Sequence, residues 1–136
     1  MVNINIAFQE FLKKRQINLQ KVDREDGTIY KGRLSVLEEH LIEFAFWIEN
    51  TEETGVAQII FNNLAVLEDQ NNRSDFLEKI NELNRMYGLY YYLVLDVDNR
   101  VFARYVTHVA SQNYEILFDI FKKGTQIISE IIKELN

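Results

Sequence analysis

The stretch YGLYYYLVLDVDNRVFARY, which runs from Tyr87 to Tyr105, constrains the fold more than any other part of the chain. Two alternating runs of apolar and other residues meet at a short polar segment, a pattern that is typical of a β-hairpin. The length of the turn decides which side chains share a face, because a slip of one residue moves every side chain to the opposite face.

A three-residue loop at positions 97–99 sorts these side chains best. Asp96 suits the first position of a type I turn, and Asn99 suits the left-handed position that follows. A two-residue turn would instead mix leucines and two arginines on one face. The three-residue loop gives a core face made of Leu89, Tyr91, Leu93, Leu95, Val101, Ala103, Tyr105 and Thr107.

The opposite face of this hairpin is too apolar for open water. Tyr92 lies opposite Arg104 in this register, where a cation–π contact can form. Surfaces of this kind mark protein interfaces, so we expect a protein to cover this one. The predicted outward residues are Tyr90, Tyr92, Val94, Asp96, Arg100, Phe102, Arg104, Val106 and His108.

Three further strands are predicted before the hairpin, over 28–37, 41–49 and 56–67. The second alternates most clearly, with one face for the core and the other face carrying Trp47. The core residues expected from the second and third strands are Ile42, Phe44, Phe46, Ile48, Ala57, Ile59 and Phe61.

Helical spacing predicts three helices. The first spans 5–19. The second follows a cap at Ser74 and ends at Gly88 in the left-handed conformation. The third begins at Ser111 or Asn113 and contains Gly124, which predicts a close approach or a bend. The order α-β-β-β-α-β-β-α over residues 1–136 predicts one α+β domain, an antiparallel sheet with helices packed mainly on one face.

Composition narrows the classes of partner. The net charge is −6, and the longest basic run is 13–15, so we expect neither nucleic acid nor an anionic membrane as a partner. The chain has no cysteine, which rules out disulfides and thiolate metal sites. No apolar run approaches the ~18 residues of a membrane span. The first residues lack a secretory-signal pattern, so we expect a cytoplasmic protein.

The run FLEKINELNRMYGLYYYLVLDVDNRVFARYVTHV, followed by a long last helix, resembles the YbjN-type family of bacterial sensory-transduction regulators. The resemblance includes Leu83-Asn84-Arg85, the tyrosine-rich strand and residues 100–106. Asn99 stands where that family often has a turn glycine. The element order is also similar to that of class I type III secretion chaperones, which are small, acidic and usually dimeric. The resemblance implies no catalytic residues.

Motifs that could carry metal or cofactor chemistry are weak. DVDN at 96–99 resembles the start of a calcium loop, but Arg100 and Val101 stand where an acidic ligand and a glycine belong. His40 and His108 have no metal-site spacing. We therefore predict no metal and no cofactor.

Enzyme motifs are equally weak. The serines lack a nucleophile motif. The acid pairs Glu38-Glu39 and Glu52-Glu53 would point to opposite faces of a strand, so neither forms an acid–base pair. The aromatic residues could form a stacking platform for single-stranded nucleic acid, which the acidic charge disfavours.

These observations predict a non-enzymatic protein-binding module, expected to be a homodimer. An alternative is a secretion-type chaperone that holds a partly unfolded client protein. A third alternative, an enzyme or small-molecule binder, would need a closed pocket with convergent polar groups. The residues expected at the protein interface are Trp47, Tyr90, Tyr92, Phe102 and Arg104.

Overall fold

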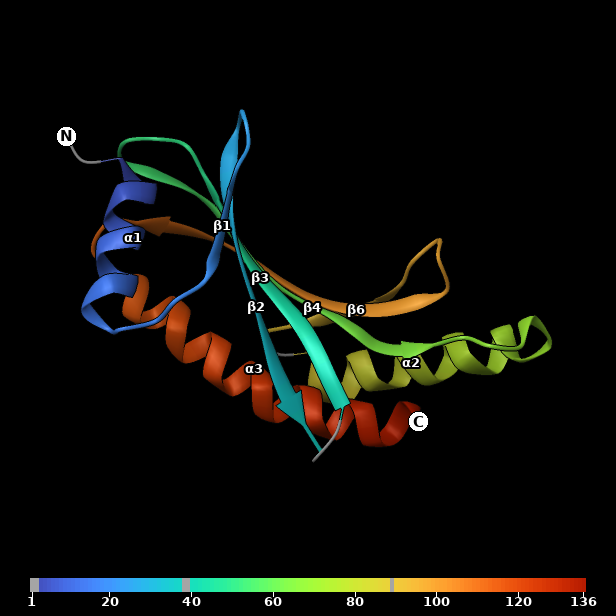
Figure 1. The fold of residues 1–136 in the computed structure, drawn as a ribbon. Helices are drawn as coiled ribbons and strands as arrows, with labels where there is room; N and C mark the ends of the chain where they lie inside the picture. Colours follow the sequence, from blue (N-terminus) through green and yellow to red (C-terminus); the bar gives the residue numbers. More distant parts are fainter. Residues whose placement is uncertain (1–2, 38–39, 89) are drawn as a thin grey trace.

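The computed structural model describes residues 3–37, 40–88 and 90–136. It is a single α+β domain in which three helices lie along one side of a strongly twisted antiparallel sheet (Figure 1), as the sequence predicts. In chain order the elements are α1 (Ile4–Lys14), β1 (Gln20–Asp23), β2 (Gly27–Val36), β3 (His40–Glu49), β4 (Thr54–Val66), the 3-10 turn η1 (Gln70–Asn72), α2 (Arg73–Tyr87), β5 (Tyr92–Leu95), β6 (Arg100–Ala110) and α3 (Tyr114–Leu135).

The sheet has six strands in the order β1-β2-β3-β4-β6-β5. One strand, β1, was not predicted. The expected first helix ends at Lys14 rather than Leu19, because Gln16 has a φ of 57° and the chain then reverses. β1 pairs with β2 through a tight turn in which Arg24 donates to the carbonyl of Gly27.

The core lies between the sheet and the helices and is rich in aromatic rings. Phe46 of β3 lies 5.6 Å from Phe8 of α1 and 5.3 Å from Phe118 of α3, centroid to centroid. Phe61 of β4 stacks on Phe121 of α3 at 5.5 Å. All seven core residues predicted from the second and third strands are buried. Rings at these separations add to the stabilisation from buried area.

The hairpin between β5 and β6 has the predicted register. Leu95 pairs with Val101, and Tyr92 pairs with Arg104. The Asp96 amide donates to the Arg100 carbonyl, and Asn99 adopts the expected left-handed conformation with a φ of 65°. Leu89, expected on the core face, lies outside the described residues.

Helix boundaries correct three predictions. Gly88 ends α2, but its φ is −76° rather than positive. The residue that precedes the first turn of α2 is Asn72, so Ser74 lies inside the helix instead of capping it. Asn113 is the residue before α3, as one alternative predicted, but its side chain accepts from the Ala110 amide and does not cap α3.

Candidate functional site

One side of the sheet has no helix over it (Figure 1), and we call this side the outer face. Its strand residues alternate with the buried core residues, so they point away from the helices. The pairing register places them in rows that cross the sheet. The apolar residues of the outer face are Val22, Ile29, Leu41, Ala45, Trp47, Val56, Ile60, Tyr92, Val94, Phe102 and Val106.

Two rows contain most of this apolar surface. In the first, Ile29 of β2 pairs with Trp47 of β3, and one polar residue, Gln58 of β4, separates Trp47 from Val106 of β6. In the second, Ala45 of β3 pairs with Ile60 of β4. Neighbouring side chains on one face of a sheet are close enough to form a continuous surface. The outer face is therefore one patch, shared by at least five strands.

Three of the predicted interface residues form a stack at one end of this patch. The Arg104 guanidinium carbon lies 5.2 Å from the Tyr92 ring centroid and 6.0 Å from the Phe102 ring centroid. Arg104 Nε also donates a hydrogen bond to the Tyr92 hydroxyl. The predicted cation–π contact is thus confirmed, and Trp47 lies in the neighbouring row.

Tyr90 does not belong to this patch, contrary to the sequence prediction. β5 begins at Tyr92, so strand alternation does not extend back to Tyr90. Its ring contacts Tyr105 at 6.1 Å and lies 5.8 Å from the Lys123 ammonium of α3. Tyr90 therefore packs on the helix side of the sheet, next to the buried Tyr91.

The apolar surface of the outer face is open to solvent. Tyr92 is 38% exposed, Val106 is 45% exposed and Leu41 is 53% exposed. Single exposed apolar residues are ordinary, but a contiguous patch of them marks an interaction surface. The core face of the same strands packs against the helices, so this surface is not needed for the core.

A second apolar surface lies at the far end of β2. An open groove of about 590 Å³ runs between β2, β3 and α3, with Leu34, Val36, Phe44 and Phe121 in its walls. Two hydroxyls on its α3 side, those of Thr125 and Ser129, donate to backbone carbonyls of the same helix. The groove thus offers mainly apolar contacts.

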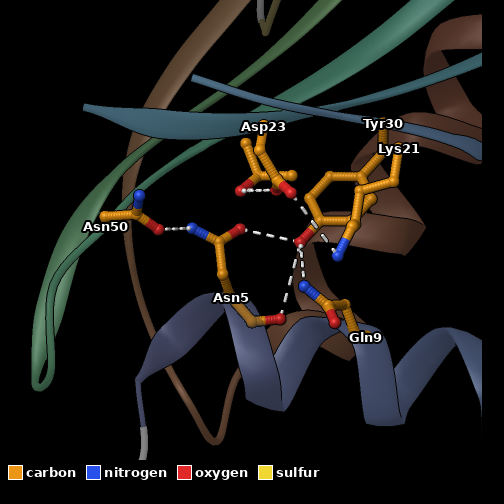
Figure 2. A network of polar contacts seen from close by, with 7 residues as sticks. Asn5, Gln9, Lys21, Asp23, Tyr30 and Asn50 are labelled. Atoms are coloured by element: carbon orange, nitrogen blue, oxygen red, sulfur yellow. Dashed lines mark hydrogen bonds and ion pairs between the residues drawn. The ribbon is translucent and has the colours of Figure 1, made fainter. Parts of the chain in front are cut away.

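A partly buried polar cluster joins α1 to the sheet (Figure 2). Asn5 Nδ2 donates to the Ile48 carbonyl at 3.0 Å and to Asn50 Oδ1 at 2.7 Å, and Asn5 Oδ1 accepts from the Tyr30 hydroxyl at 2.8 Å. Gln9 Nε2 donates to the same hydroxyl at 3.2 Å. Within the described residues every buried side-chain polar atom has a partner. A cluster in which every buried polar atom is hydrogen-bonded holds α1 in a defined position on the sheet.

Three tyrosines have raised pKa values, and burial is the main cause in each. Burial disfavours the phenolate and so raises the pKa of Tyr30, Tyr91 and Tyr114. The Tyr91 hydroxyl donates to the Ile120 carbonyl at 2.9 Å, and that of Tyr114 donates to the Ile4 carbonyl. Both hydroxyls therefore stay protonated at neutral pH and donate hydrogen bonds that connect different elements of the fold.

Three of the residues considered as metal ligands in the sequence form other hydrogen bonds in the structure. Asp96 Oδ1 accepts from the Val97 amide and Asp98 Oδ1 accepts from the Arg100 amide, so both carboxylates serve the turn. His40 Nε2 lies 2.9 Å from the Asn63 carbonyl oxygen. In the described ranges no group of three or more His, Cys, Asp or Glu residues is arranged to hold a metal. Glu38 and Glu39 lie outside those ranges.

No protein-family model matches the chain. No curated protein matches its sequence either. Across the described residues, no helix has both the length and the apolar character needed to cross a membrane.

Proposed function

We propose that this chain is a non-enzymatic protein-binding module that presents the outer face of its sheet to a protein partner. One observation supports this most directly: the outer face is a contiguous apolar patch with no helix over it, centred on Ala45, Trp47 and Ile60. Burying such a patch against a partner gains hydrophobic free energy, while leaving it in water does not.

The residue types in the patch suit an interface. Tryptophan, tyrosine and arginine contribute most to binding at protein interfaces, and the outer face has Trp47, Tyr92 and Arg104. Tyr92 and Arg104 are held in place by their mutual contact. Side chains that are already ordered lose less entropy when a partner binds.

A pull-down with mass spectrometry tests the proposal when two variants are compared. Tyr92→Glu places a charge on the outer face, whereas Met86→Glu makes the same change at an exposed site on α2. The proposal expects a partner that is lost with Tyr92→Glu and kept with Met86→Glu. A partner that both variants keep would not be bound by this face.

Self-association is one form that such docking could take, and a homodimer is part of the proposal. Sedimentation at micromolar concentrations tests it. A dimer that Tyr92→Glu converts into a monomer supports pairing through the outer face. A strict monomer at those concentrations would rule out a stable homodimer there.

A chaperone that holds a partly unfolded client is the second candidate. The open groove beside α3 favours it, because an unfolded segment can occupy two separate apolar surfaces. The element order also agrees with the resemblance to secretion chaperones. Suppression of aggregation of a denatured model protein, weakened by Leu37→Glu at the exposed rim of the groove, would support this role. If the chain did not reduce the light scattering of the aggregating model protein, this chaperone role would be excluded.

The proposal includes a cytoplasmic location and a bacterial source, the second of which comes from the resemblance to the YbjN-type family. The absence of cysteine is compatible with a reducing compartment. Cell fractionation with an antibody against the chain tests the location, and recovery outside the cytoplasm would contradict it.

A further inference from the structure

The charges of the outer face are unevenly satisfied. Arg33 pairs with Glu43 at 3.6 Å, and Glu49 Oε1 accepts from the Val56 amide at 3.0 Å. Arg104, by contrast, has no carboxylate within 4.0 Å among the described residues. Only six of the 15 basic residues have a carboxylate within 4.0 Å in the described part of the chain, so what distinguishes Arg104 is the apolar surface around it.

Arg104 is also set within apolar surroundings. The rings of Tyr92 and Phe102 flank its guanidinium, and Ile60 is its neighbour across β4. Its Nε already donates a hydrogen bond to the Tyr92 hydroxyl. A partner that covered this patch with apolar groups alone would remove Arg104 from water without replacing its hydrogen bonds, which is unfavourable. A carboxylate would satisfy it with two parallel bonds.

Lys31 is a second cation in the same row. The row runs Lys31, Ala45, Ile60, Arg104, from β2 through β3 and β4 to β6. Lys31 also has no carboxylate within 4.0 Å in the described part of the chain. Three inter-strand spacings of about 4.8 Å separate the two cations by about 14 Å. An apolar pair lies between them.

From this row we propose that the outer face binds an acidic, extended segment of a partner protein. The segment crosses the strands with one carboxylate at Arg104, an apolar side chain over Ala45 and Ile60, and a second carboxylate at Lys31. An extended chain advances about 3.3 Å per residue, so about four residues span the 14 Å. Alternate side chains share a face, which gives the pattern acid-x-apolar-x-acid. This inference rests on the proposed docking role of the outer face.

Two other occupants fit the charges less well. A second copy of the outer face would bring the carboxylates of Glu43 and Glu49, but both are already engaged, Glu43 by Arg33 and Glu49 by the Val56 amide. Single-stranded nucleic acid could stack on Trp47 and Tyr92, but its phosphates would meet few cations on a chain of net charge −6. An acidic protein segment satisfies both cations and also supplies an apolar contact.

Intrinsic fluorescence offers a direct test, because Trp47 is the chain's single tryptophan and lies on the outer face. The probes are peptides with a central Glu-Ser-Leu-Ser-Glu segment and matched versions with both glutamates changed to glutamine or lysine. We expect the glutamate peptide to shift Trp47 emission and to bind about tenfold more tightly than the glutamine peptide at low salt, a preference that 0.5 M NaCl removes.

Variants assign the preference to Arg104. Arg104→Gln should remove most of the preference for the glutamate peptide, and the double variant Arg104→Gln, Lys31→Gln should reduce the affinity for the glutamate peptide to that for the glutamine peptide. Unchanged binding of the glutamine peptide shows that each variant remains folded and that apolar docking persists. Arg85→Gln, the same change at an exposed position of α2, should leave the preference intact.

Several outcomes would overturn the inference, and they can be told apart. Equal binding of all three peptides with a Trp47 shift would exclude acid recognition but retain protein docking. No Trp47 shift with any peptide, together with no partner in the pull-down, would reject docking as well. Tighter binding of a single-stranded deoxythymidine 12-mer would assign the face to nucleic acid. A concentration-dependent Trp47 shift without peptide, abolished by Tyr92→Glu, would assign it to a second copy.

Discussion

Gly124 of α3 lies directly against the ring of Tyr91, so closely that a Cβ at position 124 would stand 2.6 Å from the tyrosine oxygen and 2.7 Å from Cζ. The Tyr91 hydroxyl donates to the Ile120 carbonyl one turn earlier in the helix. This contact joins the last helix to the segment that leads into β5. It also explains why a glycine is present in the middle of a 22-residue helix. The close approach is one of the two alternatives that the sequence predicts for Gly124.

Gly124→Ala should destabilise the fold by about 1–2 kcal/mol. Alanine favours the helix by up to about 1 kcal/mol, but overpacking against a buried ring costs about 1–3 kcal/mol. Urea denaturation measures the difference. In a Tyr91→Leu background the ring is absent, so the same substitution should become neutral or stabilising. Equal effects in both backgrounds would show that the ring is not the cause.

Asn99→Ala should destabilise the hairpin by about 1 kcal/mol, because Asn99 has a φ of 65° and alanine tolerates this region poorly. Asn99→Gly, which has no such penalty, should keep or raise stability. Thermal unfolding of both variants tests the pair. If the alanine variant were as stable as the glycine variant, the left-handed conformation at this turn would not limit stability.

The features that local chemistry decides were predictable from the sequence. The register of the hairpin depends on Asp96 and Asn99, which lie next to each other in the turn. The faces of β3 depend on strict alternation between Leu41 and Glu49. In each case a single stretch of chain contains the signal, so no knowledge of distant residues is required.

Features that depend on distant pairing could not be predicted. β1 is a four-residue strand with Val22 as its single apolar residue, so it has no alternation of its own. Tyr90 lies on the helix side, contrary to the prediction, because β5 begins at Tyr92 and its alternation does not reach Tyr90. The bulge in β4, where Asn63 has a φ of 61° and accepts from Arg100 Nη1, depends on pairing with β6.

The charge row of the outer face belongs to the same group. Lys31 and Arg104 are 73 positions apart in the sequence. They share a row because β6 lies next to β4 rather than at the edge of the sheet. A sequence pattern indicates that Arg104 faces outward, but the strand order decides which residues are its neighbours.

Asn5→Leu should destabilise the protein by about 2–4 kcal/mol. The substitution removes the hydrogen bonds of the Asn5 amide with the Ile48 carbonyl, Asn50 and the Tyr30 hydroxyl, and each such bond contributes about 0.5–1.5 kcal/mol. Urea denaturation gives the free energy, and hydrogen exchange should show faster opening of α1. Gln9→Leu, which removes one longer bond to the same hydroxyl, should cost less. Equal costs would mean that Asn5 does not anchor the cluster.

Stability should fall as the pH rises above 10. The pKa values of Tyr30, Tyr91 and Tyr114 are raised in the folded protein above the ordinary value of 10.0. Above that value the unfolded chain releases phenol protons that the folded chain retains. The unfolded state then binds fewer protons, and the free energy of unfolding decreases with pH. Below pH 10 both states keep these protons, so the three tyrosines have no effect there.

Urea midpoints between pH 8 and pH 11 measure this dependence, and Tyr91→Phe isolates one contributor. The variant should be less stable than the parent at pH 8, because it lacks the hydrogen bond to Ile120. Its stability should also fall less steeply above pH 10, because it has one fewer buried phenol. Parallel curves for the two proteins would show that Tyr91 ionises as readily when folded as when unfolded, which its burial and its carbonyl partner oppose.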